Sequence, residues 1–198
     1  MFRIFVRQFL CASIIFLLFS CFFFGGGSSS YEFNSAKTYA RIDKDLKDVF
    51  SQLAAGVTLI TIENAGSHHA MTATAFMPLS VDPPLVLVAI EKKNETHKLF
   101  CSNNNSFGIS LLSADQQRIS DRYARKDSDR YHFEGVETFT GPAGSVLISG
   151  CSAAVEAELS KEYDAGDHTI FIGKISWAQA YVENQPLVYW QRGYHYLT

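Results

Sequence analysis

Apolar and polar residues follow two different periods along the chain, and the first clear pattern is helical. The pattern over residues 42–54 predicts a surface helix that ends before Gly56. Its apolar face consists of Ile42, Leu46, Val49, Phe50, Leu53 and Ala54. Residues 57–62 form a short segment rich in β-branched side chains, and residues 63–67 have the composition of a turn. Residues 70–76 are again expected to be extended. These segments predict a β-hairpin directly after the helix.

The middle of the chain predicts two more strands with a short helix between them. Two prolines precede residues 85–90, a continuous apolar run that is typical of a strand buried on both faces. A helix is expected to begin near Thr96, with Leu99 and Phe100 directed inward. Residues 107–112 then predict the next strand.

A capping box marks a further helix. Ser113 and Gln116 have the types and spacing that satisfy the first backbone donors of a helix carrying Ile119 and Tyr123. Residues 125–145 are polar and glycine-rich, without a clear element. Three more strands are expected at residues 153–159, where the pattern alternates, at residues 169–176 and at residues 187–190.

At least six short strands with two or three peripheral helices predict a mainly β fold. The strands are separated by turn signals rather than by crossover helices, which favours a closed or partly closed β-barrel over a βαβ sheet. The chain contains neither a G-x-G-x-x-G segment after a strand nor a Walker-type G-K-[ST] segment. A dinucleotide-binding sheet and a P-loop are therefore excluded.

Composition divides the chain into two parts. Residues 1–30 hold eight of the sixteen Phe and no acidic residue, and they run from basic through apolar (9–24) to a Gly/Ser stretch (25–30). This order is typical of a signal sequence or a short membrane anchor with a linker, although a mis-started leader without bearing on the domain explains it as well. Residues 31–198 are expected to form a single domain.

Charge, cysteines and histidines narrow the chemistry of the domain. Residues 31–198 carry fifteen basic and twenty acidic residues, a net charge of −5, which argues against a nucleic-acid partner. The domain's two cysteines, Cys101 and Cys151, are expected to be reduced and packed rather than joined. The histidines lack the spacing of metal ligands, so no metal site is predicted.

Three segments carry candidate chemistry, each with a plain structural alternative. Four small residues at 72–75 allow backbone groups to approach a flat or phosphorylated ligand, or they form an ordinary tight corner. Residues 94–98 precede a helix whose free N–H groups favour an anion, or Asn94 is a plain N-cap. Residues 163–168 place a glycine between acids and end on His168, which predicts either a ligand-facing loop or a simple β-turn.

Taken together and in this order, these segments indicate a particular protein family. The run GVTLIT, MTATAFMPLSVDPPLVLVAI, FGISLLSADQQRISDRYA, YDAGDHTIFIGKI and PLVYW resembles the flavin reductase family, which has an FMN-binding split barrel. The resemblance covers residues 42–197. It implies a homodimer of split β-barrels that binds FMN or FAD, oxidises NADH or NADPH and, in many members, supplies reduced flavin to a partner monooxygenase.

The resemblance also implies site residues. The flavin-binding positions fall on Thr72, Ala73, Thr74, Ala75, Ser80, Val81, Asn94, Thr96, His97, Lys98 and Ser110, and the nicotinamide loop falls on Tyr163, Asp164, Gly166, Asp167 and His168. His168 is expected to orient the nicotinamide. Two departures from the family pattern stand out, namely the acid Glu95, where many relatives are basic, and one additional residue before Arg192.

The expected activity is therefore an NAD(P)H:flavin oxidoreductase. Its alternatives are a flavoprotein that retains FMN and passes electrons elsewhere, and a flavin-binding barrel without catalysis. Because the nicotinamide cofactor is cytoplasmic, the catalytic domain is expected on the cytoplasmic side, with membrane contact only through residues 1–30. The leader by itself would indicate export.

Overall fold

The computed structural model describes residues 45–64, 66–102, 106–125 and 128–197. The leader expected at residues 1–30 and the first residues of the domain lie outside this part of the chain. Among the described residues, no helix combines the length and apolar character that crossing a membrane requires.

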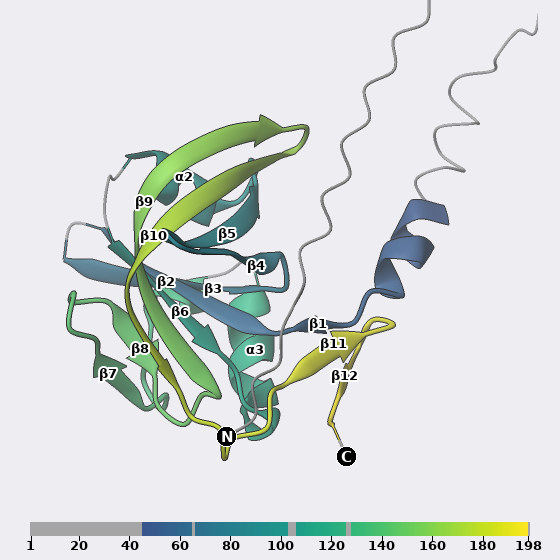
Figure 1. Ribbon diagram of the computed structural model, residues 1–198. Coiled ribbons are helices and arrows are strands. Elements are labelled where there is room, and N and C mark those ends of the chain that lie inside the picture. Colours follow the sequence, from purple (N-terminus) through teal and green to yellow (C-terminus); the bar gives the residue numbers. More distant parts are fainter. Residues whose placement is uncertain (1–44, 65, 103–105, 126–127, 198) are drawn as a thin grey trace, which may run out of the picture.

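Seven antiparallel strands form one sheet that curves into a split barrel, in the order β3-β2-β6-β9-β10-β5-β4 (Figure 1). In chain order they are β2 (Thr58–Asn64), β3 (Ser67–Ala73), β4 (Phe76–Val81), β5 (Pro84–Glu91), β6 (Ser106–Leu111), β9 (Ala153–Ala165) and β10 (His168–Ala180). The edge strands β3 and β4 are connected through Thr74 and Ala75, so both edges of the sheet meet at one corner. The expected mainly β fold and barrel architecture are confirmed.

Smaller elements surround this sheet. They are β1 (Ala55–Gly56), β11 (Val188–Trp190) and β12 (Gly193–His195) in one sheet, β7 (Thr138–Thr140) and β8 (Val146–Ile148) in another, the helices α2 (Glu95–Ser102) and α3 (Gln117–Ala124), and the 3₁₀ turns η1 (Ala114–Gln116) and η2 (Ser128–Tyr131). In Figure 1, α2 lies beneath the arch formed by β9 and β10, whereas α3 lies on the other side of the barrel, near β11.

The barrel interior is filled by aliphatic and aromatic side chains from both the strands and α2. Leu99 and Phe100 are buried, as their spacing predicted. The ring centroid of Phe100 lies 5.0 Å from those of both Phe107 and Phe171, in tilted arrangements. These contacts fix α2, and with it the position of its first turn, against the strands.

The expected capping box is confirmed. The side-chain oxygen of Gln116 accepts the backbone N–H of Ser113 at 3.1 Å, and the helical stretch begins with the 3₁₀ turn η1 before α3. Tyr123 is fully buried on α3 and donates its hydroxyl to the His132 carbonyl at 2.7 Å. Hence α3 is anchored against β3 at the position where the small-residue segment begins.

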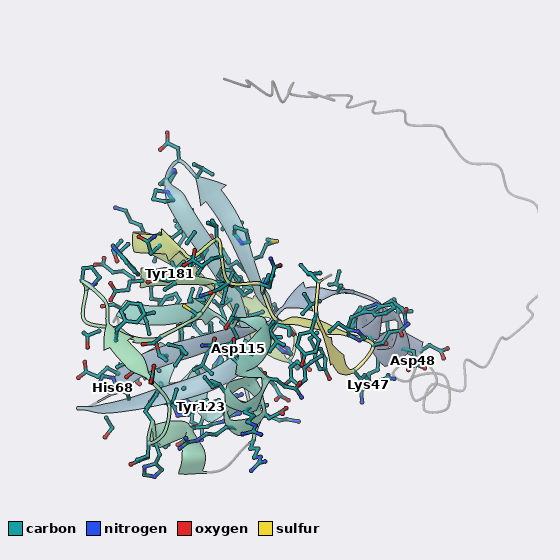
Figure 2. All side chains as sticks on the ribbon, turned by 90° about the horizontal axis from the view of Figure 1, so that it is seen from below. Lys47, Asp48, His68, Asp115, Tyr123 and Tyr181 are labelled. Carbon is teal, nitrogen blue, oxygen red and sulfur yellow. The ribbon has the colours of Figure 1, made fainter. Side chains whose placement is uncertain are left out.

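The N-terminal helix differs from its prediction in length and in setting. Its described part covers residues 45–51, and Gly56, expected just beyond the helix, pairs with β11 instead. Its apolar face is exposed: the relative accessibility is 69% for Phe50 and 75% for Leu53. Figure 2 shows Lys47 and Asp48 of this helix well apart from the barrel strands.

The C-terminal hairpin holds this helix by its end rather than by its apolar face. The backbone N–H of Gln191 donates to the Ser51 carbonyl at 2.8 Å, and the Trp190 indole donates to the Gln52 carbonyl at 3.1 Å. Gln191 and Arg192 both have positive φ, as a type I′ hairpin turn requires. The additional residue noted in the sequence therefore belongs to this two-residue turn.

Two strand predictions are wrong in their burial patterns, in opposite directions. β5 alternates, with Val86, Val88 and Ile90 buried and the residues between them half-buried, whereas burial on both faces was expected. β9 was expected to alternate but is buried continuously over residues 154–157. The β7–β8 connection covers this part of β9, because both Glu156 carboxylate oxygens accept backbone N–H groups of that loop.

Several boundaries also differ from the expected ones. Phe76 begins a separate strand, β4. The sequence patterns did not predict this strand, and they did not predict β7, β8 or β12 either. β9 and β10 each extend over 13 residues, so residues 163–165 lie in a strand and the turn reduces to Gly166 and Asp167. The two cysteines among the described residues are free, but only Cys151 is packed, since Cys101 is exposed.

Candidate functional site

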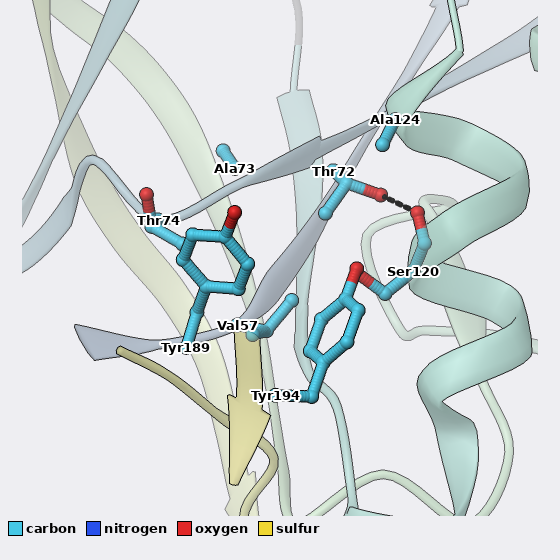
Figure 3. A pocket seen from close by; sticks show the side chains of 8 residues that line it. All are labelled: Val57, Thr72, Ala73, Thr74, Ser120, Ala124, Tyr189 and Tyr194. Atoms are coloured by element: carbon cyan, nitrogen blue, oxygen red, sulfur yellow. Dashed lines mark hydrogen bonds between the residues drawn. The ribbon is translucent and has the colours of Figure 1, made fainter. Parts of the chain in front are cut away.

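The small-residue segment forms one wall of a cavity at the corner where β3 and β4 meet. Thr72 and Ala73 end β3 and are half-buried, while Thr74 and Ala75 form the exposed connection. The cavity has a volume of about 170 Å³ (Figure 3). It is lined by Val57, Thr72, Ala73, Thr74, Ser120, Ala124, Tyr189 and Tyr194.

Hydrogen bonds and ring packing fix the walls of this cavity. The Thr72 hydroxyl donates to the Ser120 carbonyl at 2.7 Å, the bond drawn dashed in Figure 3, and the Ser120 hydroxyl lies 2.8 Å from the Tyr194 hydroxyl. The rings of Tyr189 and Tyr194 meet edge to face at 5.4 Å. Burial raises the pKa of Tyr194. The result is an uncharged wall of hydroxyls and aromatic rings that suits a flat polar heterocycle.

A second cavity, of about 510 Å³, shares Thr74 and Tyr189 with the first. It is lined by Lys47, Phe50, Ser51, Leu53, Ala55, Thr74, Ala75, Tyr189 and Arg192. The guanidinium of Arg192 pairs with the Asp48 carboxylate at 2.5 Å, so the hairpin turn and the N-terminal helix close this cavity together. The two adjoining cavities provide the space that a nucleotide-sized ligand requires.

The second candidate segment begins α2, and its first polar groups bind one another. The Asn94 side-chain oxygen accepts the backbone N–H of Thr96 at 3.2 Å and the Thr96 hydroxyl at 3.1 Å, so Asn94 acts as an N-cap. Thr96 is fully buried. The Asn94 amide nitrogen lies 3.1 Å from the sulfur of Met71, the residue before Thr72. This contact brings the two segments side by side.

The turn η2 packs against the same helix end. Arg130 is only 4% exposed and donates from Nη1 to the Asn94 side-chain oxygen at 2.8 Å. The neighbouring Tyr131 hydroxyl donates to the Glu95 carboxylate. The pKa of Tyr131 is raised, mainly by burial and to a smaller extent by this hydrogen bond. The acid that departs from the family pattern is thus already engaged by a hydroxyl of the protein.

A buried histidine completes this cluster. His69 on β3 is fully buried, and its Nε2 lies 2.8 Å from the Thr96 hydroxyl. Its other ring nitrogen, Nδ1, is buried without a hydrogen-bond partner among the described residues. Burial and, to a smaller extent, the charge of Arg130 lower the pKa of His69 to about 4. The ring is therefore neutral near pH 7.

The third segment lies at the tip of the long β9–β10 hairpin. Gly166 has a φ of +69°, which a two-residue hairpin turn accepts most readily from glycine at this position. His168 is half-exposed, and its Nδ1 lies 2.6 Å from the Asp167 carboxylate. This hydrogen bond lowers the pKa of Asp167. The imidazole is held from one side and remains open on the other.

Lys92 connects this tip to the end of β5. Its ammonium group donates to the Asp164 carboxylate at 2.5 Å and to the Gly166 carbonyl at 2.6 Å, and its backbone N–H donates to the Asp167 carbonyl at 2.9 Å. The hydrogen bond from Lys92 lowers the pKa of Asp164. Because Lys92 precedes Asn94 by two residues, the hairpin tip and the first turn of α2 adjoin.

The structure brings together most, but not all, of the residues expected from the sequence. The prediction of Ser110 near the ligand is not supported, because Ser110 is fully buried and its hydroxyl accepts the Ile148 N–H at 2.9 Å. His97 is directed to β10, where its Nε2 lies 2.8 Å from the Thr169 hydroxyl. Lys98 is exposed. The exact roles of the expected flavin-binding residues stay predictions.

Ser80 and Val81 end β4, the far edge of the sheet. Ser80 is half-buried and pairs with Leu85, and Val81 is 93% exposed. Neither lines the two cavities described above. Their predicted contact with a flavin therefore lies outside these two cavities and stays a prediction.

Sequence patterns missed six residues of the site. They are His69, Lys92, Ser120, Arg130, Tyr189 and Tyr194, which come from strands, helices and turns far apart along the chain. Tyr189 and Tyr194 flank the additional residue before Arg192, and no sequence pattern marked either of them as a site residue. Arg130 lay in a polar stretch without a predicted element, where a buried cation gives no local signal.

The architecture places the chain in the class of split-barrel proteins. Residues 50–198 match the family described as flavin reductase like domain, and the chain belongs to this family.

Named relatives agree with this assignment. The reductase component of 4-hydroxyphenylacetate 3-monooxygenase from Thermus thermophilus is 32% identical over 152 residues, which are 77% of this chain and 95% of that protein. The FMN reductase (NADH) SmoA from Agrobacterium fabrum is 32% identical, over 74% of this chain and 81% of its own.

Solved structures show the same fold. BorF, the flavin reductase component of a bacterial two-component tryptophan halogenase, is 36% identical with a TM-score of 0.71, covering 78% of this chain and 98% of BorF. The NADH:FAD oxidoreductase SgcE6 of Streptomyces globisporus, in complex with NAD and FAD fragments, is 28% identical with a TM-score of 0.74, covering 80% and 94%.

Proposed function

We propose that this protein is an NAD(P)H:flavin oxidoreductase that reduces FMN or FAD and supplies the reduced flavin to a partner monooxygenase. The observation that carries the proposal is the corner of the barrel. There β3 lines an uncharged, aromatic-lined cavity with Thr72 and Ala73, and through Met71 it contacts a capped helix end with a buried cation. A flavin nucleotide has the same two-part chemistry, a flat heterocycle and a phosphate. Relatives named as NADH-dependent flavin reductases support the assignment.

The residues present fit such a cofactor. In the proposal, Thr72, Ala73 and Thr74 let the isoalloxazine approach the backbone, and Tyr189 forms the facing wall. The turn at Asn94 is assigned the phosphate, with Lys98 as an exposed cation nearby along α2. A bound flavin supplies the redox chemistry by accepting a hydride from the nicotinamide. The protein holds the flavin and the nicotinamide in the orientation that hydride transfer requires and excludes other orientations. This chemistry needs no nucleophile with an activating base.

His168 is the proposed nicotinamide contact. It lies on the hairpin tip that Lys92 ties to the segment before α2, and its side chain is half-exposed. Asp167 holds Nδ1 and leaves Nε2 to interact with a carboxamide or ribose. In this role His168 orients the donor ring and transfers no hydride itself.

The homodimer expected from the resemblance is part of the same proposal. Exposed apolar side chains lie on and just after the N-terminal helix, with Phe50 and Leu53, and on β4, with Met77, Leu79 and Val81. Exposed apolar surface of this kind is typical of a surface that another chain covers. Sedimentation equilibrium should give a dimer that Phe50→Glu weakens and that the exposed control Val182→Glu leaves intact. A monomeric wild type would contradict this part of the proposal.

The activity is tested with the full chain and, in parallel, with residues 31–198. Oxidation of NADH and of NADPH is followed at 340 nm, without flavin and with added FMN, FAD or riboflavin. Oxidation that increases with free flavin supports the reductase. A yellow protein that turns over without added flavin instead supports the FMN-retaining electron-transfer alternative. Absence of oxidation under every condition contradicts both and leaves a non-catalytic flavin-binding barrel.

For localisation we propose a cytoplasmic catalytic domain, with residues 1–30 as its membrane anchor. The reason is chemical, because the nicotinamide donor is available in the cytoplasm. Fractionation of the tagged full chain, with protease protection of the domain, tests this placement. Export of the domain would overturn it.

A further inference from the structure

Arg130 is a buried cation in a turn that the sequence did not mark. It lies in η2 with 4% relative accessibility. Removing a guanidinium from water is costly, so a buried arginine is retained where its hydrogen bonds are well made. Two of these bonds go to uncharged oxygens, from Nε to the Arg125 carbonyl at 2.6 Å and from Nη1 to the Asn94 side chain at 2.8 Å.

The bond to Asn94 is one end of a directed chain of hydrogen bonds. Because the Thr96 hydroxyl donates to Asn94, it must accept from His69, which fixes the His69 proton on Nε2. Asn94 thus receives the Thr96 hydroxyl and backbone N–H together with Arg130, all on the same oxygen. The amide side chain is held in one orientation, with its nitrogen against Met71.

This chain couples β3, η2 and the first turn of α2. Thr96 is fully buried, so its hydroxyl lies beneath the surface and is occupied within the protein. Glu95, the nearest acid in the sequence, is engaged by the Tyr131 hydroxyl from the same turn as Arg130. The turn η2 therefore shapes this helix end from two sides, through Arg130 on Asn94 and through Tyr131 on Glu95.

We propose that Arg130 is a positioning residue that makes the site selective for flavins carrying a phosphoryl group, acting through Asn94. The inference rests on the proposed flavin site. It adds to this site a residue that determines flavin selectivity and that lies outside the three segments expected from the sequence. Riboflavin shares the ring of FMN but lacks the phosphate. A residue that acts at the phosphate end should change the affinity for FMN and leave that for riboflavin nearly the same.

The test measures equilibrium binding of FMN and of riboflavin by quenching of flavin fluorescence, and KM and kcat for both with saturating NADH. For Arg130→Met we expect the Kd of FMN to rise about tenfold, with less than a twofold change for riboflavin and an unchanged kcat. Arg130→Lys, which keeps the charge but not the planar fork, should recover part of the affinity for FMN. Arg122→Met, an arginine near η2 that donates to the Glu134 carbonyl, is the matched control.

A second variant keeps the proposal testable if Arg130→Met does not fold, as judged by near-ultraviolet circular dichroism. Asn94→Asp preserves the size of the side chain and places a carboxylate opposite Arg130. This variant should also weaken the binding of FMN and leave the binding of riboflavin nearly unchanged. An equal loss of FMN and riboflavin, or no loss at all, would overturn the proposal. Failure of the wild type to bind either flavin would instead contradict the proposed function, so the two failures are distinguishable.

Discussion

The two ends of the proposed flavin site are built from opposite chemistry. At the barrel corner, Tyr189, Tyr194 and the small residues of β3 form an uncharged cavity. At the start of α2, the buried Arg130 donates to the capping amide of Asn94, and the buried His69 bonds to the Thr96 hydroxyl beside it. In the proposed site, the first region recognises the flavin ring by shape and stacking, and the second recognises the phosphate end by charge and hydrogen-bond direction. Changes at the first should therefore affect all flavins alike, whereas changes at the second should distinguish them by their phosphate.

The largest effect is expected from filling the corner. Thr74→Trp places an indole where the two cavities join, which leaves no room for the isoalloxazine. Binding of FMN and of riboflavin should be lost together in fluorescence titrations. Val182→Trp, at an 88% exposed position, controls for the added ring. Loss of FMN binding alone would show that the corner does not hold the ring.

His168→Ala tests the hairpin tip, which belongs to neither end. Misplacing the nicotinamide should slow hydride transfer by about 100-fold, the order of magnitude that a displacement of about 1 Å can cost. The Kd of FMN should be unchanged, because His168 is assigned to the donor. Stopped-flow reduction and flavin titration measure the two quantities, with the exposed His132→Ala as control. Equal losses in rate and flavin affinity would contradict the assignment.

The pH dependence of stability tests the charged end without any ligand. The folded-state pKa of His69 is about 4, below its ordinary 6.5, so the unfolded chain binds the proton first as the pH falls. The stabilising contribution of neutral His69 is complete at pH 7 and is lost progressively between about pH 6.5 and 4. Between pH 7 and 5 it should account for about 2 kcal/mol of the free energy of unfolding.

The measurement is urea denaturation at several pH values for the wild type and for His69→Gln, whose amide can donate to Thr96. The variant should lose the His69 part of the pH dependence. His68→Gln, on the neighbouring and half-buried residue of the same strand, should retain it. Parallel curves for all three proteins would show that folding does not lower the pKa of His69.

The smallest effect is expected at the link between the charged end and the hairpin tip. Lys92→Met removes a partly exposed ion pair with Asp164, an interaction that solvent screens strongly. We expect kcat with NADH to fall about two- to threefold, with an unchanged Kd for FMN, and the difference to shrink in high salt. The exposed neighbour Lys93→Met is the control. A larger change in the Kd of FMN than in kcat would show that Lys92 acts on flavin binding, at the phosphate end, and not on the hairpin tip.

Prediction from the sequence succeeded where the signal was local. The capping box at Ser113, the inward face of α2 and the hairpin of β2 and β3 were all recognised from spacing and residue type. Burial of strands was predicted poorly, because whether β5 or β9 is covered depends on distant segments such as the β7–β8 loop. The N-terminal helix showed the opposite limit: its apolar pattern was predicted correctly, but none of the residues that the structure describes buries this face.

The sequence by itself determined the class of fold, the small-residue corner and the order of the motifs, because these depend on residue types at short spacing. The tertiary structure decided which polar groups meet. His69, Asn94 and Arg130 are separated by 25 and 36 residues, and no local pattern links them. Their association depends on where η2 packs, and hydrogen bonds in a buried cluster have direction only once all the partners are in place.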